Sequence, residues 1–301
     1  MNDNCTSPAS IADLLHNLQQ SAYLIVISAK SAADIGRMFK LEHSETVLGR
    51  SHEAQFQIED DGISRKHAKV VALGNGRFQL MDLSTNGTYL NGQRASTAPL
   101  YDGDKIQTGS NTVLKFSIQD QLEEQYQRSI YESATRDGLT RLYNKKFFMA
   151  TLRKEFTYCL RHQLPLSLVM FKVDHFTMIN DVYSHPAGDY VLTRIAQRVS
   201  DTVRMEDLLV RYDGSVFALM LRESAEEQAY EYAERCQRAV DRSDFIFSGT
   251  PIKATISLGV ATLLNSDFAQ PEDLIVAADK YLHRAKRAGR NRVDAKAVSG
   301  P

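Results

Sequence analysis

Short apolar runs separated by turn residues fill the chain from about Tyr23 to Phe116. Hydrophobic and polar positions alternate in most of these runs, which is typical of strands with one buried face. The runs read YLIVIS, RMFKLEH, AKVVAL, RFQLMDL, TYLN, KIQTG and TVLKFSI. Turn pairs such as Asn86-Gly87 and Asn91-Gly92 lie between them. Seven or more short strands at this spacing predict an all-β sandwich over residues 21–118.

A different pattern begins after Thr135, where apolar runs alternate with amphipathic segments. LSLVMFKV predicts a buried strand, LLVRY and VFALML predict a hairpin, and IKATISLGVA predicts a further strand. Apolar residues at helical spacing predict three helices, at Tyr190–Val203, Glu226–Val240 and Pro271–Ala288. The alternation predicts an α/β domain over residues 135–296, with helices covering a sheet.

The remaining segments are a tail at each end and a connection between the domains. Residues 1–20 predict a flexible tail, with a short helix from Ser10, and residues 297–301 predict a second tail. Residues 119–134 are polar and predict a connecting helix. Its apolar residues recur every four positions, at Leu122, Tyr126 and Ile130. This stripe leaves a homodimer through the helix open, and two heptads are a short pattern for a coiled coil.

Composition excludes several classes of protein. The 301 residues are 43% hydrophobic and 24% charged, which are ordinary globular values. Lys and Arg number 36 against 37 Asp and Glu, so no bulk charge draws the chain to a nucleic acid polymer or an anionic membrane. Apolar runs fall short of the roughly 20 residues of a membrane span, and we see no secretory signal. The three cysteines suit neither a disulfide framework nor zinc. We expect a soluble cytoplasmic protein without membrane insertion.

Three loop motifs in the first domain carry phosphate chemistry. They are Gly49-Arg50-Ser51, Ser64-Arg65-Lys66-His67-Ala68 and the stretch from Asp82 to Gly92, DLSTNGTYLNG. Guanidinium groups and hydroxyls suit a phosphate dianion, and Asn amides suit a peptide backbone. Each motif alone is also compatible with a plain hairpin turn and a solvated arginine.

Together and in this order, these motifs resemble the forkhead-associated (FHA) domain, a β-sandwich that binds phosphothreonine peptides. The resemblance implies a phosphothreonine-containing protein as partner. It implies that Arg50 and Ser64 contact the phosphate with Thr85 beside it, and that Arg65 and Asn86 hold the peptide backbone. His67 is expected to be a structural histidine that braces the loops.

The second domain carries motifs at its start, middle and end. They are Asp137-Gly138-Leu139-Thr140, Ile179-Asn180-Asp181, Gly188-Asp189, Thr255-Ile256-Ser257-Leu258-Gly259 and Ala285-Lys286-Arg287-Ala288-Gly289-Arg290-Asn291. The set resembles the GGDEF domain of diguanylate cyclases, which join two GTP molecules into cyclic di-GMP. The resemblance implies a cyclase-like α/β fold with a central, mainly antiparallel sheet flanked by helices.

The catalytic positions depart from the family's pattern. The hairpin that should read Gly-Gly-Asp/Glu-Glu-Phe reads DGSVF, which places Ser215 and Val216 at the two acidic positions. The third metal-binding acid, at the end of a strand, is replaced by Lys172. Mg²⁺ requires carboxylate and phosphate oxygens, so we expect no Mg²⁺ site, no catalytic residues and no cyclase activity. Asp174 remains, but we expect it to point to the opposite face of the sheet.

Other family positions are retained. Asn180 and Asp189 match guanine-reading positions, and Lys286 and Arg290 match triphosphate contacts, so GTP binding stays open. Lys172 either puts a positive charge where the metal sat, allowing GTP to bind without metal, or reaches solvent from a decayed site. The basic run around Lys286 is also compatible with the solvated end of a helix.

A second ligand site is expected at Arg204, Asp207 and Arg235. These residues match the family's inhibitory product site, an Arg-x-x-Asp motif plus an arginine on the next helix, which binds intercalated cyclic di-GMP. A guanidinium pairs with O6 and N7 of guanine, and a carboxylate accepts hydrogen bonds from N1 and N2. The bland alternative is a surface Arg–Asp pair at the end of a helix.

These observations predict a non-catalytic bacterial signalling adaptor, a cyclic di-GMP receptor with a phosphothreonine-docking domain. Two alternatives stay open: a scaffold that binds no nucleotide, and a cyclase with weak residual activity. A further hypothesis concerns Thr6 in the N-terminal tail, which after phosphorylation would occupy the protein's own FHA domain or that of a second copy.

Overall fold

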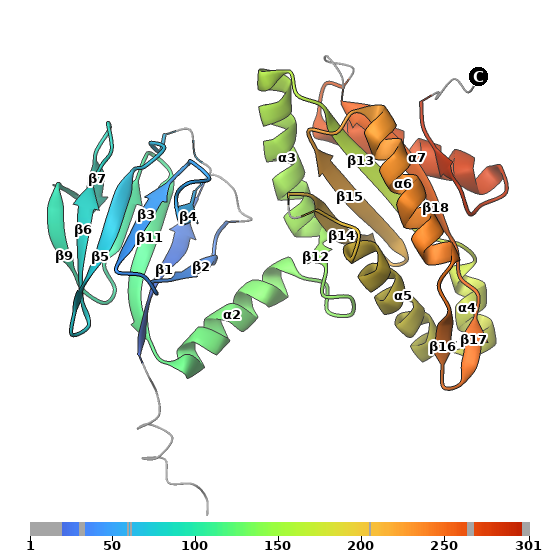
Figure 1. The fold of residues 1–301 in the computed structure, drawn as a ribbon, viewed down its shortest axis with the longest axis horizontal. Coiled ribbons are helices and arrows are strands. Elements are labelled where there is room, and N and C mark those ends of the chain that lie inside the picture. Colours follow the sequence, from blue (N-terminus) through green and yellow to red (C-terminus); the bar gives the residue numbers. More distant parts are fainter. Residues whose placement is uncertain are drawn as a thin grey trace, which may run out of the picture. The chain divides into compact units, whose positions relative to one another are not determined.

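The computed structural model describes residues 20–29, 34–58, 60, 62–204, 206–263 and 268–296. The chain divides into two compact units, Met1–Ala134 and Thr135–Pro301, which are described separately below (Figure 1). Thr6, the short helix expected from Ser10 and the expected C-terminal tail lie outside the described residues. Within the described residues, no helix is long and apolar enough to cross a lipid bilayer.

The first unit contains two β-sheets that share one core. The strand order of one sheet is β2 (Met38–Lys40), β1 (Ser21–Ser28), β11 (Thr112–Gln119), β10 (Lys105–Thr108), β7 (Thr88–Leu90), β8 (Gln93–Ala95). The order of the other is β4 (Phe56–Gln57), β3 (Glu45–Gly49), β5 (Ala68–Gly74), β6 (Arg77–Asp82), β9 (Thr97–Leu100). Both sheets contribute fully buried side chains to the core, such as Leu24, Phe116, Leu48 and Leu80. The expected β-sandwich is therefore confirmed.

The helix after the sandwich is α2, Gln121–Thr135. The side chain of Asp120 accepts a hydrogen bond from the Glu123 N–H at 2.8 Å, which caps its first turn. The helix contacts the sandwich, because the Tyr23 hydroxyl donates to Glu124 at 2.6 Å. Burial, together with this carboxylate, raises the pKa of Tyr23 to about 12. The predicted apolar stripe of α2 remains exposed within the unit, at 69%, 59% and 48% for Leu122, Tyr126 and Ile130.

The second unit is built on one six-stranded sheet. Its order is β12 (Tyr143–Asn144), β14 (Leu208–Asp213), β15 (Val216–Arg222), β13 (Leu166–Val173), β18 (Ile256–Leu263), β19 (Val293–Asp294). The two outermost strand pairs are parallel and the three inner pairs are antiparallel. A small hairpin of β16 (Phe245–Phe247) and β17 (Thr250–Ile252) stands apart from this sheet. The mainly antiparallel sheet agrees with the expected fold.

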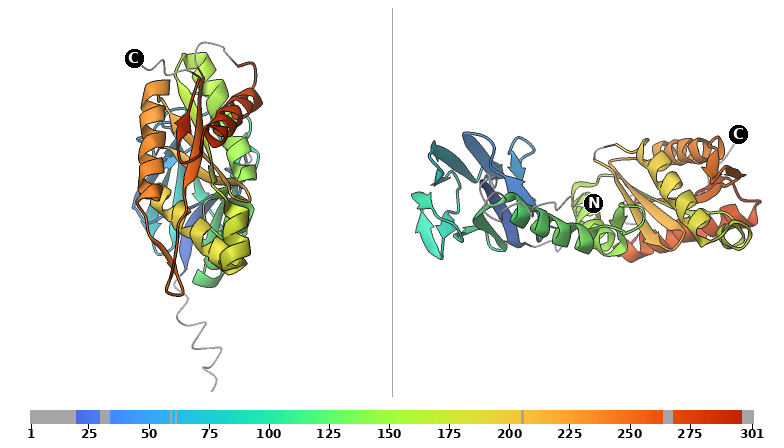
Figure 2. Two further views of the ribbon diagram at one scale, coloured as in Figure 1. Left: turned by 90° about the vertical axis from the view of Figure 1, so that its right-hand side faces the viewer. Right: turned by 90° about the horizontal axis from the view of Figure 1, so that it is seen from below.

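Five helices cover this sheet on both faces (Figures 1 and 2). They are α3 (Lys145–His162), α4 (Phe176–Tyr183), α5 (His185–Ser200), α6 (Glu226–Asp241) and α7 (Pro271–Arg287). On one face, Val169, Phe171 and Val173 of β13 share a core with α5 and α6. On the other face, Leu166, Leu168 and Met170 share a core with α3 and α7. Because side chains alternate along a strand, Lys172 belongs to the face covered by α7.

Helix α7 approaches β18 very closely at one point. A Cβ atom on Gly259 would lie 2.2 Å from the Ala278 carbonyl oxygen and 2.1 Å from the Leu282 nitrogen. Only glycine allows this contact between the two backbones. The contact fixes the position of the last turn of α7, which carries Lys286.

Candidate functional site

Two loops of the first unit are held together by their backbones. The Arg50 N–H donates to the Ser64 carbonyl at 3.1 Å, and the Ser51 N–H donates to the Arg65 carbonyl at 3.2 Å. A Cβ atom on Gly49 would lie 2.1 Å from that Arg65 oxygen, so a side chain at this position would separate the loops. The backbone of Arg50 is thereby fixed beside Ser64, while the Arg50 side chain is exposed.

A buried histidine braces the same loops. His67 is fully buried, and its Nδ1 accepts a hydrogen bond from the Ser64 N–H at 3.1 Å. Burial lowers the pKa of His67, so the imidazole is neutral at pH 7. The Ser64 hydroxyl oxygen in turn accepts from the Thr85 N–H at 3.3 Å. The structure thus brings together Arg50, Ser64 and Thr85, the three residues expected around the phosphate.

The turn that carries Thr85 and Asn86 is stabilised by a polar network. One carboxylate oxygen of Asp82 accepts from the Ser84 N–H at 3.0 Å, the Ser84 hydroxyl at 2.7 Å and the Thr88 hydroxyl at 2.8 Å. Burial opposes ionisation of Asp82, but these hydrogen bonds outweigh it and lower its pKa. The network holds the base of the turn and leaves Thr85 and Asn86 exposed at its tip.

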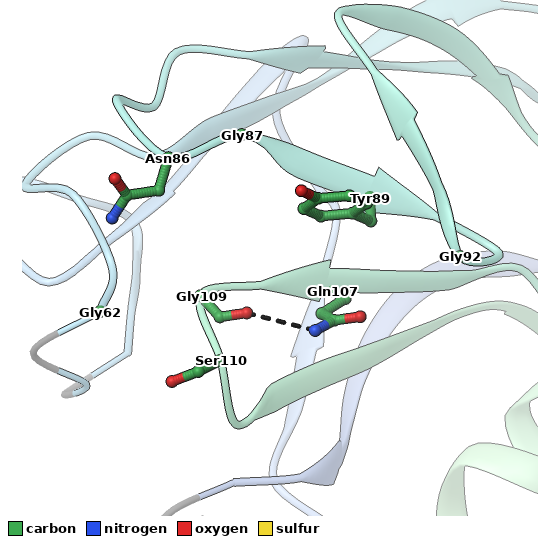
Figure 3. Close-up of a pocket in the computed structure, with 8 residues that line it drawn as sticks. All are labelled: Gly62, Asn86, Gly87, Tyr89, Gly92, Gln107, Gly109 and Ser110. Carbon is green, nitrogen blue, oxygen red and sulfur yellow. Dashed lines mark hydrogen bonds between the residues drawn. The ribbon is translucent and has the colours of Figure 1, made fainter.

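Asn86 is one of the residues that line an open groove of about 500 Å³ (Figure 3). Its other lining residues are Gly62, Gly87, Tyr89, Gly92, Gln107, Gly109 and Ser110. Tyr89 and Gln107 are directly opposite one another on β7 and β10, so a sheet forms the floor. Arg65, the other residue expected to hold a peptide backbone, is exposed on the loop before β5.

In the second unit, the positions expected to bind metal meet at one end of three strands. Lys172 of β13 is directly opposite Val216 of β15 and Ser257 of β18. Ser215 is buried, and its carbonyl accepts a hydrogen bond from the Val173 N–H at 3.2 Å. No group of three or more His, Cys, Asp or Glu suited to a metal occurs among the described residues. An ammonium, a hydroxyl and an isopropyl group do not fit Mg²⁺, which is held by oxygen ligands.

The expected orientation of Asp174 is wrong. Its carboxylate accepts hydrogen bonds from the hydroxyls of Ser257 at 2.7 Å and Thr255 at 2.8 Å, and from the Asn291 N–H at 3.1 Å. Ser257 is directly opposite Lys172 in the ladder, so Asp174 points to the same face as Lys172. The reason is the two-residue period of a strand, which returns positions 172 and 174 to one face. Asp174 is buried and joins the ends of β13, β18 and the loop after α7.

An ion pair that the sequence did not predict supports the hairpin. The Arg211 guanidinium donates to Asp137 at 3.0 Å, and its Nε donates to the Gly214 carbonyl at 2.8 Å. Burial works against ionisation of Asp137, but hydrogen bonds from Thr140 and Arg211 hold its pKa below the usual value. The motif at the start of the second domain therefore contacts the turn between β14 and β15. Both Asp137 and Arg211 lie in or beside recognisable motifs, but sequence spacing does not show that the two residues touch.

Asn180 and Asp189 lie where α4 and α5 meet. A Cβ atom on Gly188 would lie 1.8 Å from Oδ1 of Asn180, so the two helices touch at that glycine. The Asn180 Oδ1 is buried and has no hydrogen-bond partner in the described structure. Asp189 follows Gly188 and is exposed. The two residues expected to read guanine thus lie on touching helices, with Asn180 against Gly188 and Asp189 one residue further along α5.

Lys286 and Arg290 lie at the end of α7 and just beyond it. The Arg290 N–H donates to the Ala285 carbonyl at 3.1 Å, and Arg290 adopts a left-handed backbone conformation with φ of 62°. Lys286 is half-buried. Its pKa is lowered by burial and by the positive charges of Lys172 and Arg290. Lys172 and Arg290 therefore both lie within electrostatic reach of Lys286.

The expected cyclic di-GMP site combines the turn before β14 with helix α6. The Asp207 N–H donates to the Arg204 carbonyl at 3.2 Å, and Oδ1 of Asp207 accepts from the Arg222 N–H at 3.2 Å. Oδ2 of Asp207 is buried without a hydrogen-bond partner among the described residues. Burial raises the pKa of Asp207, whereas the Arg204 charge lowers it. The Arg204 side chain is exposed.

Tyr232 connects this turn to Arg235. The Arg235 guanidinium lies 4.6 Å from the centroid of the Tyr232 ring, and the Tyr232 hydroxyl donates to the Thr202 carbonyl. Burial raises the pKa of Tyr232, and the Asp207 charge adds to this effect. Asp207 and Arg235 therefore both lie near one buried tyrosine that the sequence did not point to, and Arg204 lies in the same turn as Asp207.

Comparison with known proteins finds a family match in each of the two units. Residues 134–292, more than half of the chain, match the family model described as diguanylate cyclase, GGDEF domain. The chain belongs to the GGDEF family. Residues 46–109 match the FHA domain model, so an FHA domain precedes the GGDEF domain.

Relatives of this GGDEF protein include named cyclases. Diguanylate cyclase A of Treponema denticola is 35% identical over 168 residues, which are 54% of this chain and 45% of the relative. Diguanylate cyclase DosC of Escherichia coli K12 is 34% identical over 173 residues, which are 56% of this chain and 37% of the relative. The GGDEF protein thus covers less than half the length of these two relatives.

A solved structure resembles the second unit. The coiled coil and GGDEF domain of DgcB from Caulobacter crescentus, in complex with c-di-GMP, is 26% identical with a TM-score of 0.54. The match covers 58% of this chain and 92% of the DgcB chain. Together the comparisons show a GGDEF/FHA signalling protein related to diguanylate cyclases.

Proposed function

We propose that this chain is a bacterial signalling protein that binds cyclic di-GMP without synthesising it and docks phosphothreonine proteins through its FHA domain. One contrast carries the proposal. The residues at the metal-binding positions, Lys172, Ser215 and Val216, bear no carboxylate. In contrast, Arg204 and Asp207 remain in one turn, and Asp207 and Arg235 both lie near Tyr232.

The loss of synthesis follows from charge. In-line attack on a triphosphate requires divalent ions to neutralise the developing charge, and those ions require hard oxygen ligands. Lys172 repels a divalent ion, and neither the Ser215 hydroxyl nor the Val216 side chain replaces a carboxylate. The nearby carboxylate of Asp174 accepts three hydrogen bonds from protein groups. We therefore infer that the site does not hold the divalent ions that synthesis requires.

Binding of cyclic di-GMP is supported by the arrangement around Tyr232. The exposed guanidinium groups of Arg204 and Arg235 offer paired donors to the O6 and N7 atoms of guanine. The unpartnered Oδ2 of Asp207 offers an acceptor for guanine N–H groups. A related structure, that of the DgcB GGDEF domain, is itself a complex with c-di-GMP.

The binding proposal is tested by the affinity of the full chain and matched variants for cyclic di-GMP. Arg204→Ala and Arg235→Ala are each expected to weaken binding at least about tenfold, since a hydrogen bond to a charged group contributes about 1.5–3 kcal/mol. Arg238→Ala is the control, because Arg238 lies one turn further along α6 and pairs with Glu234 at 3.3 Å. Equal affinity of Arg204→Ala and the wild type would remove the site assignment.

The loss of synthesis is tested separately by incubating the full chain with GTP and Mg²⁺ or Mn²⁺ and separating the products by chromatography. We expect no cyclic di-GMP above the level of a protein-free blank. Sustained product formation that disappears in Asp174→Asn would instead support a cyclase with an altered metal site. Absence of both synthesis and binding would support the scaffold that binds no nucleotide.

Phosphothreonine docking by the FHA domain is supported by its connected loops. The bonds between Arg50, Ser64 and Thr85 place a guanidinium and two hydroxyl groups on adjoining segments. Binding of a phosphothreonine peptide library is expected to be lost in Arg50→Ala and kept in Arg77→Ala, an exposed arginine at the start of β6. Retained binding in Arg50→Ala would contradict the assignment.

Helix α2 supports a further part of the proposal, a homodimer. Its exposed apolar residues, Leu122, Tyr126 and Ile130, form one stripe at helical spacing. A second copy of the same helix covers such a stripe symmetrically. Sedimentation of the full chain is expected to show a dimer that Tyr126→Glu converts to a monomer. A monomeric wild type would exclude this part.

Because cyclic di-GMP is a bacterial second messenger, we place the protein in the cytoplasm.

A further inference from the structure

Two cations, Lys172 and Arg290, lie within electrostatic reach of a third, Lys286. Lys172, Lys286 and Arg290 are each half-buried. Among the residues that the structure describes, none forms an ion pair or a side-chain hydrogen bond with any of them. A partly desolvated cation without a partner is unfavourable, and several together are more so. This arrangement is typical of a site for an anion.

The fold holds these cations on one face of the sheet. Lys172 lies on the face covered by α7, directly opposite Ser257. The backbone contact at Gly259 fixes α7 against β18, and the next turn of that helix carries Lys286. The hydrogen bond from the Arg290 N–H to the Ala285 carbonyl keeps Arg290 at the helix end. The cluster is therefore a consequence of sheet register and helix packing.

Nearby carboxylates do not satisfy the cluster. Asp174 is occupied by Ser257, Thr255 and Asn291, as described above. Asp279 lies about two turns before Lys286 on α7, and its Oδ2 is 3.6 Å from Nε2 of His283. Both carboxylates partly offset the positive charge at Lys286, yet burial and the two neighbouring cations still lower its pKa. Three cations against two carboxylates leave an excess positive charge.

We propose that Lys172 converts the metal position into an anion site, which binds the triphosphate of a guanine nucleotide without a divalent ion. The lysine ammonium takes over the charge neutralisation that Mg²⁺ provides in an oxygen-ligand site. A Mg²⁺-complexed triphosphate has less negative charge and carries a cation that Lys172 repels. The site therefore prefers the metal-free nucleotide. This inference does not depend on the cyclic di-GMP site.

The guanine preference comes from the meeting point of α4 and α5. Asn180 carries an amide whose oxygen is unpartnered and lies against Gly188, and the next residue, Asp189, carries an exposed carboxylate. Amide and carboxylate oxygens accept hydrogen bonds from the N1 and N2 groups of guanine. Adenine presents no such pair of donors at these positions.

The experiment is a calorimetric titration of the full chain with GTP and, separately, with inorganic tripolyphosphate, each in EDTA and in excess Mg²⁺. Both probes are expected to bind in EDTA and to bind more weakly in Mg²⁺. Lys172→Gln, which removes the charge and keeps a polar side chain only slightly shorter, is expected to weaken both about 10- to 100-fold in EDTA. Asn180→Ala is expected to weaken GTP alone.

Matched controls keep the result interpretable. Lys280→Gln removes an exposed cation from α7 and is expected to bind like the wild type. Thermal unfolding of each variant confirms that it is folded. GTP binding that requires Mg²⁺, no binding in EDTA, or wild-type affinity in Lys172→Gln would each overturn the proposal.

Discussion

Replacement of Asp174 by alanine is expected to destabilise the second unit strongly without any involvement of metal. The Asp174 carboxylate accepts three hydrogen bonds. Their donors are Ser257 in β18, Thr255 just before that strand, and the Asn291 N–H in the loop after α7. Alanine removes the only acceptor in this set and leaves three donors behind. The buried location of Asp174 keeps water from replacing it freely.

The magnitude follows from the burial of each donor. The Ser257 side chain is fully buried, so the loss of its acceptor costs about 1–3 kcal/mol. Thr255 and the Asn291 N–H belong to half-buried residues, and each loss costs about 1 kcal/mol. The sum is about 3–5 kcal/mol in the free energy of unfolding. For a domain of this size, that loss lowers the thermal midpoint by roughly 10 °C.

Scanning calorimetry of the full chain measures this effect on the transition of the second unit. Asp213→Ala is the matched control, because Asp213 is an exposed carboxylate on the hairpin and its loss should change stability by no more than about 0.5 kcal/mol. Each protein is scanned in EDTA and in excess Mg²⁺. An unchanged midpoint in Asp174→Ala, or a deficit that appears only with Mg²⁺, would refute the structural role and favour a metal ligand.

Three further predictions concern buried groups and a close backbone contact. Burial lowers the pKa of His67, so the neutral ring stabilises the FHA domain above the ordinary histidine pKa, and this contribution is lost as the pH falls. His67→Asn should therefore flatten the decline of the thermal midpoint with falling pH. Burial raises the pKa of Asp207, so its ionised form destabilises the fold at neutral pH. Asp207→Asn should raise the thermal midpoint at pH 7, and this gain should shrink as acid protonates the wild-type carboxyl. Thermal melts over a series of pH values measure the gain. Gly49→Ala should cost roughly 1–3 kcal/mol or more, because its Cβ meets the Arg65 oxygen, and should abolish phosphothreonine peptide binding; urea unfolding and a peptide titration check both.

Periodicity predicted the principal elements of both domains. The alternation in TVLKFSI and the apolar run LSLVMFKV became β11 and β13, and the helical spacing from Glu226 became α6. Short strands such as β4, which has two residues, leave too little pattern to detect. Helix α3 was missed because its apolar and basic residues are interspersed, and its burial depends on the sheet beneath it. The predicted strand from Ile252 is interrupted before Ile256, where β18 begins.

The candidate sites were predicted as residues but not as contacts. Motif order placed Arg50 near Ser64, and the structure adds the backbone bonds and the Gly49 contact that hold them. The pairing of Arg211 with Asp137 and the role of Tyr232 join segments far apart in the chain, which spacing does not reveal. The error at Asp174 had another source, a miscounted strand alternation that the Ser257 register corrects.

Binding of cyclic di-GMP by this GGDEF protein is tested first by a calorimetric titration of the full chain with cyclic di-GMP, beside Arg204→Ala. We expect saturable binding in the micromolar range or tighter, with the heat lost in the variant. No heat from the wild type, or equal heat from both proteins, would contradict it.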